Sequence, residues 1–199
     1  TEKIMLLLTR SLKNEYGINN LCLAGGVALN CVANGKILKE KIFENIWVQP
    51  AAGDAGGSLG AALAYWHIEL NKDRKVINKD NMQGSYLGNE FRDNEIIKKL
   101  NLIGAQYENL EEKEIIERTA QDLVDGKAVG WFQGRMEFGP RALGNRSILG
   151  DPRSDTMQKN LNLKVKYRES FRPFAPSILR EDLNDWFEMN TDSPYMLLV

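Results

Sequence analysis

The chain has 199 residues, of which 43% are hydrophobic and 27% are charged, and its formal net charge is −1. This composition is ordinary for a globular protein and gives no reason to expect disorder. No apolar run approaches the roughly 20 residues that a helix needs to span a bilayer, and no leader peptide is visible. We therefore expect a cytoplasmic protein with no membrane partner.

The first 70 residues alternate between helical and strand-like patterns. Residues 1–16 have apolar side chains at helical spacing, residues 21–34 read as strand, double glycine and helix, and residues 46–66 repeat that order. This alternation predicts a parallel α/β unit. Gly25 and Gly26 bring the backbone close to whatever lies at the strand end, and the following helix N-terminus favours negative charge. Asp54 heads the next helix, where an ordinary N-cap role is sufficient to explain it.

The few histidine and cysteine residues do not form a recognisable metal or redox site. His67 has no second histidine within four residues, so we interpret it as a packing or surface residue. Cys22 and Cys31 lack C-x-x-C spacing and are predicted to be two buried thiols.

The remaining segments are predicted in chain order. Residues 71–89 are polar and turn-rich, and residues 90–126 form two amphipathic helices with a net charge of −5, which indicates a solvated face. A strand is predicted over 127–132, a helix near 154–163, a strand over 174–179 and a helix over 181–188. The sequence opens within a helical pattern and closes on the strand-like run 195–199, so we expect an internal piece of a longer protein.

Residues 133–150, QGRMEFGPRALGNRSILG, are the most informative part of the sequence. Arg135, Arg141 and Arg146 are separated by glycines and one proline. Guanidinium groups suit phosphate and carboxylate oxygens, so the pattern predicts a preformed anion-binding loop. The alternative is a surface loop whose arginines pair with nearby carboxylates.

Charge counting favours the anion-binding interpretation. Residues 131–180 contain ten Lys/Arg and four Asp/Glu, a net charge of +6 in a chain of −1. A local positive field in a near-neutral protein indicates a small anionic ligand. Nucleic acid is disfavoured, because Trp131, Phe171 and Phe174 lie in apolar contexts and are predicted to be core residues rather than stacking platforms.

These residues also carry a family resemblance. The runs GRMEFGPRALGNRSILGDPR and KYRESFRPFAPSIL resemble the C-terminal region of O-carbamoyltransferases of the NodU/CmcH family. The resemblance implies a YrdC-like domain that binds carbamoyl phosphate and ATP. It implies catalytic roles for Arg135, Arg141, Arg146 and Lys166, and substrate-binding roles for Glu137, Gly139, Ser147, Arg168 and Arg172. We expect these cationic side chains to share one pocket.

The N-terminal motifs GGVALN and GDAGGSLGAA resemble the nucleotide-binding half of the actin/sugar-kinase-like fold, in the branch that carbamoyltransferases share with tRNA threonylcarbamoyl-transferring proteins. The resemblance implies that Gly25, Gly26 and Asn30 contact a nucleotide. It also implies that Asp54 is a ligand of a divalent metal, usually iron. The family's paired metal-binding histidines have no counterpart here.

Together these patterns predict an α/β protein. Its expected domains are a partial actin/sugar-kinase-like domain over 1–75, a linker over 76–89 and a YrdC-like α/β domain over 90–199. The expected function is to activate carbamoyl phosphate with ATP as carbamoyl-adenylate and to transfer the carbamoyl group to a hydroxyl of a small-molecule acceptor. We expect the 199 residues by themselves to be inactive in transfer. The alternatives are a threonylcarbamoyl-type tRNA-modifying protein, against which the acidic segment 90–126 argues, and a non-catalytic nucleotide-binding module.

Overall fold

The computed structural model describes residues 1–77 and 79–199, which form two compact units. Unit 1 comprises Thr1–Gly88, Glu137–Leu143 and Arg180–Val199. Unit 2 comprises Asn89–Met136 and Gly144–Leu179. Units defined by internal contacts need not coincide with domains, so the predicted domains 1–75 and 90–199 stay predictions. Residue 78 of the predicted linker lies outside the described residues.

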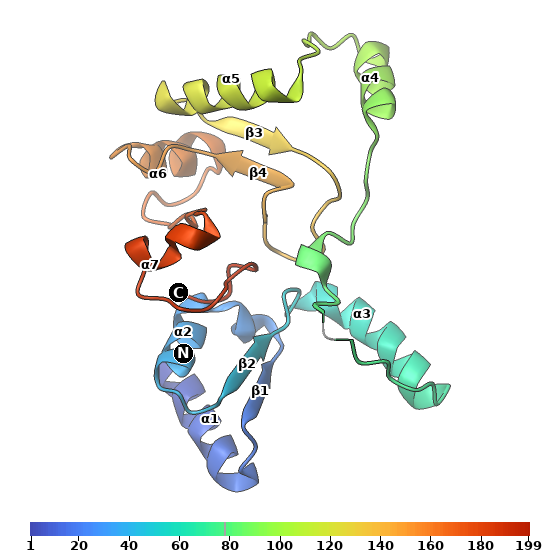
Figure 1. Cartoon of the computed structure of the whole chain (residues 1–199), viewed down its shortest axis with the longest axis vertical. Helices are drawn as coiled ribbons and strands as arrows, with labels where there is room; N and C mark the ends of the chain where they lie inside the picture. Colours follow the sequence, from blue (N-terminus) through green and yellow to red (C-terminus); the bar gives the residue numbers. More distant parts are fainter. Residues whose placement is uncertain (78) are drawn as a thin grey trace. The chain divides into compact units, whose positions relative to one another are not determined.

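Unit 1 is built on a pair of parallel strands (Figure 1). Strand β1 pairs with β2 in the register Leu21↔Ile46, which confirms the predicted parallel α/β arrangement. The elements of the unit are α1 (Glu2–Tyr16), β1 (Asn20–Leu23), η1 (Gly26–Leu29), α2 (Cys31–Lys39), β2 (Asn45–Val48), α3 (Asp54–Ala64), η2 (Tyr65–Glu69), η3 (Gln83–Ser85), η5 (Arg180–Asp182) and α7 (Leu183–Trp186).

The core of unit 1 lies where α1 and α2 pack together against β1. Met5 of α1, Leu21 of β1 and Ile37 of α2 are buried in one cluster with Ala33 and Phe43. The predicted first helix is confirmed, and it ends at Gly17, whose left-handed backbone lets its N–H donate to the Lys13 carbonyl. The apolar side chains that predicted this helix are themselves exposed, and Met5 and Thr9 are buried instead.

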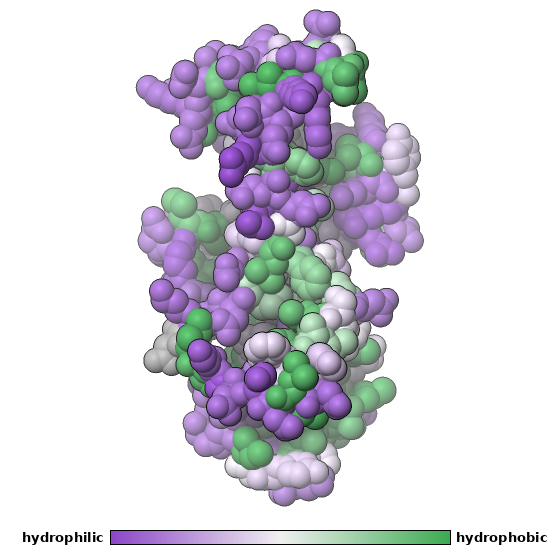
Figure 2. Space-filling view, turned by 90° about the vertical axis from the view of Figure 1, so that its right-hand side faces the viewer, coloured by the Kyte–Doolittle hydropathy of each residue, from purple (hydrophilic) through white to green (hydrophobic). Residues whose placement is uncertain are grey.

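Helix α3 is apolar but buries none of its residues against the described part of the chain. Leu63 near the end of α3 is exposed, as are Tyr65 and Trp66 of the π-helical turn η2 that follows. Figure 2 faces the side on which α3 lies in Figure 1, and apolar residues gather in the lower part of that view. The glycine-rich start of α3 packs its backbone closely on the loop that precedes it, since a Cβ at Gly56 would lie 2.1 Å from the Ala51 carbonyl oxygen.

Unit 2 is an antiparallel hairpin with helices around it. Strands β3 (Val129–Phe132) and β4 (Arg146–Leu149) pair in the register Phe132↔Arg146, and α5 (Glu112–Val124) packs on β3 (Figure 1). The other elements are α4 (Asp93–Leu102), α6 (Met157–Asn160) and the π-helical η4 (Leu161–Val165). The strand near 127–132 and the two helices within 90–126 are confirmed.

Several predicted elements are wrong in extent or kind. Residues 146–149, interpreted as part of the arginine loop, form β4. Residues 174–179 form no strand, because Pro173 and Pro176 lack the N–H groups that a ladder needs. Residues 195–199 are also not a strand, and Leu197 is instead buried with its carbonyl accepting from Asn34 Nδ2 at 3.0 Å. The helix predicted over 181–188 is reduced to η5 and the short α7.

Some burial expectations are corrected as well. Cys22 is exposed and Cys31 is half-buried, both as free thiols, because strand residues alternate and Leu21 takes the inward position on β1. Phe171 is 76% exposed rather than part of a core, whereas Trp131 and Phe174 are half-buried. Within the described residues, no helix is both long and apolar enough to cross a membrane.

The close packing at the start of α3 generates a matched pair of stability predictions. Gly56→Ala should destabilise the fold by about 1–3 kcal/mol, because the new methyl group overlaps the Ala51 carbonyl. Gly57→Ala should be neutral or stabilise by up to about 1 kcal/mol, because its Cβ meets nothing within 4 Å and alanine favours helix. Urea denaturation followed by circular dichroism measures both, and equal effects of the two variants would contradict the packing.

Candidate functional site

The carboxyl ends of β1 and β2 meet at one edge of the sheet, and the loops that follow them are joined there. Gly25 has φ 92°, a backbone conformation that favours glycine, and its N–H donates to the Ala52 carbonyl at 2.7 Å. Gly26 begins η1, and Asn30 caps α2 through a 3.1 Å hydrogen bond from Ala33 N–H. Asp54 is exposed as the first residue of α3, whose N-cap is Gly53 rather than Asp54.

A segment from the arginine-rich motif packs on these loops. Residues 137–143 belong to unit 1, and Arg141 Nη2 donates to the Leu29 carbonyl at 2.8 Å. Gly139, at φ 125°, lies so close to the loop after β2 that a Cβ there would be 3.3 Å from Ala51 Cα. The two ends of the segment are joined by a hydrogen bond of 2.7 Å, which Glu137 Oε1 accepts from the Leu143 N–H.

Arg141 and the double-glycine loop are therefore neighbours, although the sequence assigned them to separate sites. The Nε–H of Arg141 is buried without a hydrogen-bond partner among the described residues. A buried donor left in this way costs about 1–3 kcal/mol, so it favours an acceptor that can reach it. The backbone turn at Gly25, the start of η1 and this guanidinium together make a surface suited to an anionic group.

A second cluster surrounds Arg146 in unit 2. The Arg146 guanidinium donates to the carbonyls of Gln133, Gly134 and Asn145 at 2.6–3.2 Å and lies 3.4 Å from the centroid of the Phe132 ring. Ser147 Oγ accepts from Gly144 N–H at 3.0 Å, and Asn145 Nδ2 donates to the Arg135 carbonyl at 2.7 Å. These contacts hold the turn that connects the arginines to the hairpin.

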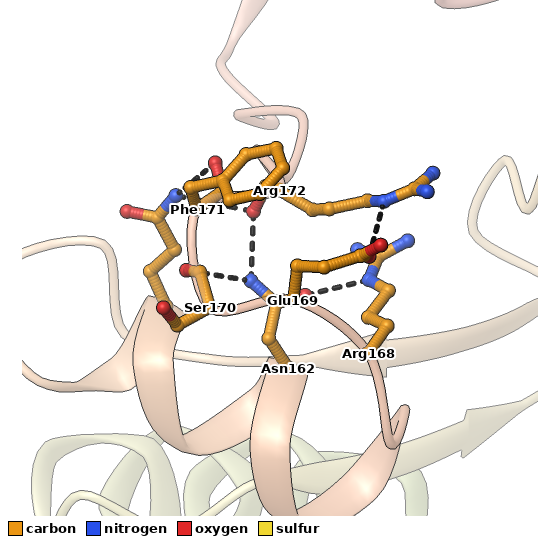
Figure 3. A network of polar contacts seen from close by, with 7 residues as sticks. Asn162, Arg168, Glu169, Ser170, Phe171 and Arg172 are labelled. Atoms are coloured by element: carbon orange, nitrogen blue, oxygen red, sulfur yellow. Dashed lines mark hydrogen bonds and ion pairs between the residues drawn. The ribbon is translucent and has the colours of Figure 1, made fainter.

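The third cluster is the loop after η4, which is organised by a fully buried asparagine (Figure 3). Asn162 Nδ2 donates to the carbonyls of Ser170 and Arg172 at 3.2 and 2.8 Å, and Arg168 Nε donates to Asn162 Oδ1 at 2.6 Å. Arg172 Nε donates to Glu169 Oε2 at 3.0 Å. One amide therefore fixes the loop that presents both arginines, and Lys166 lies exposed where η4 ends.

The predicted site residues thus fall into three clusters by their described contacts. Arg141, Gly25, Gly26 and Asn30 lie in unit 1, Arg135 and Arg146 lie at the hairpin, and Arg168 and Arg172 lie around Asn162. Their charges are not buried together, because Arg135, Lys166 and Arg172 are exposed and the others are half-buried. A single shared pocket stays a prediction.

Asp54 does not have the neighbours that a transition metal requires. Such sites generally use three or more protein ligands, and within residues 1–77 and 79–199 no group of three His, Cys, Asp or Glu side chains is placed to hold a metal. His67 is half-buried on η2, with Nδ1 2.8 Å from the Lys72 carbonyl oxygen. The described residues around Asp54 therefore do not fit an iron centre.

Two family models match the segments that carry these clusters. Residues 1–63 match the model described as carbamoyltransferase N-terminus, and residues 120–199 match the one described as carbamoyltransferase C-terminus. The chain belongs to the carbamoyltransferase family.

Curated relatives match all or nearly all of the chain. The chain is 57% identical to an uncharacterized protein of Synechocystis, matching all of this chain and 33% of that protein. It is 44% identical to nodulation protein NolNO of Sinorhizobium fredii, over all of this chain and 29% of the relative. It is 42% identical to nodulation protein NolO of Bradyrhizobium diazoefficiens, over 94% of this chain and 34% of the relative. The chain therefore spans about a third of the length of these relatives.

Sequence reasoning missed three residues that shape the loops and the aromatic wall of unit 2. Asn162 gave no signal, because an asparagine within LNLKV reads as a surface residue. Phe132 and Phe91 were not singled out, although their rings lie 6.5 Å apart in unit 2.

The Asn162 loop generates a prediction about acid stability. The backbone N–H of Glu169, followed by the hydrogen bond and charge of Arg172, lowers the pKa of the Glu169 carboxyl. A carboxyl whose pKa is lowered in the folded state stabilises the fold at pH values above the ordinary carboxyl pKa of about 4.3. That stabilisation is lost as the pH falls through the lowered pKa. Between about pH 5 and pH 3, the melting temperature of the unmodified protein should therefore fall more steeply than that of Glu169→Gln.

Thermal melting across that pH range measures the difference. Glu188→Gln is the control, because it removes a carboxylate whose side chain is 96% exposed. Identical pH profiles for the unmodified protein and Glu169→Gln would show that the Arg172 contact does not persist in solution.

Proposed function

We propose that this carbamoyltransferase activates carbamoyl phosphate with ATP and passes the carbamoyl group to a hydroxyl of a small-molecule acceptor. Carbamoyl phosphate, ATP and water give carbamoyl-adenylate, phosphate and pyrophosphate. The acceptor oxygen then attacks the carbamoyl carbon, AMP leaves, and the hydroxyl proton is released. Family membership across both matched segments is the observation that carries the proposal.

The cationic clusters of unit 2 supply what the activation step needs. Phosphate transfer depends on positioning and on neutralising negative charge, and guanidinium groups do both. Arg135 Nε lies 3.7 Å from Glu90 Oε2, and Arg172 Nε lies 3.0 Å from Glu169 Oε2. All four side chains are about half exposed. Exposed ion pairs contribute only about 0–1 kcal/mol, so the phosphates of a substrate can replace these carboxylates at little cost.

The surface at the strand ends of unit 1 supports the transfer step. Gly25 has no side chain to cover the backbone beside η1. The guanidinium of Arg141 is held near it by a hydrogen bond to the Leu29 carbonyl. An adenylate presents a phosphate that suits such a combination of backbone and arginine. We assign Gly25, Gly26, Asn30 and Arg141 to binding the adenylate during transfer.

Alanine substitution of the arginines tests the proposal. Arg141→Ala and Arg146→Ala should each weaken binding of ATP or carbamoyl phosphate by about tenfold or more, since a charge-assisted hydrogen bond contributes roughly 1.5–3 kcal/mol. Arg153→Ala is the matched control, because Arg153 pairs with Asp151 and its side chain is 72% exposed. Calorimetry gives the affinities, and pyrophosphate release measures activation.

The outcomes separate the proposed functions. Release of pyrophosphate that requires both carbamoyl phosphate and ATP supports activation. Binding of ATP with no release under any condition, including in a full-length relative, would favour a non-catalytic nucleotide-binding module. Unchanged affinity in both arginine variants, with the fold intact, would reduce these arginines to structural residues.

A further inference from the structure

Element η3 of unit 1 is a turn with a strained backbone. Gln83, Gly84 and Ser85 have φ angles of 50°, 72° and 65°, so three consecutive residues take the left-handed conformation. Residues other than glycine adopt this conformation rarely, and then singly. Such strain persists only where the surrounding structure enforces it, and strained residues cluster at functional sites. The turn is therefore a candidate for a role beyond reversing the chain.

Contacts within unit 1 hold this turn in place. The hydroxyl of Tyr195 accepts from the Gly84 N–H at 3.0 Å and donates to the Asp80 carboxylate. Ser85 is buried, with 1% of its surface exposed. Gly84 also makes room for the ring of Tyr86, because a Cβ at Gly84 would lie 2.7 Å from Tyr86 Cε2. The conformation of the turn thus decides where the Tyr86 ring lies.

The turn and Tyr86 are bonded to both ends of segment 137–143. The Ser85 carbonyl accepts from the Phe138 N–H at 2.6 Å. The Tyr86 hydroxyl donates to the Leu143 carbonyl at 2.8 Å. These two hydrogen bonds join the strained turn to the part of the arginine-rich motif that belongs to unit 1.

Arg141 lies between the two anchored ends. Its Nη2 donates to the Leu29 carbonyl at 2.8 Å, and its Nε–H is buried without a hydrogen-bond partner among the described residues. Glu137 Oε1 accepts from the Leu143 N–H, so both backbone polar groups of Leu143 are bonded to side chains. A guanidinium on a segment that is anchored in this way loses little freedom when an anion binds.

We infer that Tyr86 is a positioning residue, whose hydroxyl holds segment 137–143 so that Arg141 stays beside the Gly25 loop to bind the phosphate of an adenylate. The inference rests on the proposed function for the assignment of Arg141 to the adenylate. Its independent support is the strained turn, which is bonded to the segment that carries this arginine. A turn that only reversed the chain could use glycine or asparagine at the left-handed positions with less strain.

The test measures binding at Arg141 itself. In heteronuclear NMR spectra, the Arg141 Nε–H signal is assigned from its loss in Arg141→Lys. AMP should shift this signal in the unmodified protein, whereas adenosine, which has no phosphate, should leave it in place. Tyr86→Phe keeps the ring and removes only the hydroxyl. It should raise the Kd of AMP obtained from this signal by about 3- to 10-fold, because one hydrogen bond that holds the segment is lost.

Tyr107→Phe is the matched control, because the Tyr107 hydroxyl also donates one hydrogen bond, to Asn101 Oδ1 in unit 2 at 3.0 Å. Its Kd for AMP should not change, and circular dichroism checks that each variant is folded. An unchanged Kd in Tyr86→Phe, or an equal rise in Tyr107→Phe, would overturn the inference and leave the proposed function standing. If AMP does not shift the Arg141 signal in the unmodified protein, the assignment of Arg141 to the adenylate is wrong, and the inference fails with it.

Discussion

The parallel pairing of β1 with β2 is the constraint on which the arrangement of unit 1 depends. Parallel strands end at the same edge of a sheet, so the loops after Leu23 and Val48 meet there. The hydrogen bond from Gly25 N–H to the Ala52 carbonyl joins these loops, and Arg141 then reaches the Leu29 carbonyl beside them. A slip in register would turn Leu21 away from the core, and it would also separate the two loops from each other.

Arginine has a structural role in the described residues, and in the function that we propose it has a second role in binding phosphate. Arg141 and Arg146 each donate to backbone carbonyls, and these contacts hold a segment in place before any ligand arrives. A guanidinium has five N–H donors, so such contacts leave capacity for phosphate oxygens. Donors that are already fixed lose less conformational freedom when the ligand binds, and this loss is a large part of the cost of recognition.

The sequence predicted the local elements of residues 1–70 well, but it predicted several elements of residues 146–199 and the long-range contacts poorly. The strand, glycine and helix order around Gly25 follows from short-range patterns, and the parallel pairing confirms it. The packing of residues 137–143 on unit 1 depends on a hydrogen bond between residues 112 positions apart, which no local pattern encodes. The strand 146–149 was missed because glycines and arginines surround it, and its pairing with β3 decides its conformation.

The remaining difficulty for prediction is the buried polar residue. Asn162 is fully buried, and its amide joins Arg168, Ser170 and Arg172, so this side chain sets where two predicted ligand-binding arginines lie. A buried amide costs free energy unless its hydrogen bonds are made, and here they are made to loop carbonyls rather than to regular structure. Because that compensation exists only in the folded loop, sequence periodicity cannot reveal it. The position of Glu169 follows from the same loop, which holds its carboxylate against Arg172.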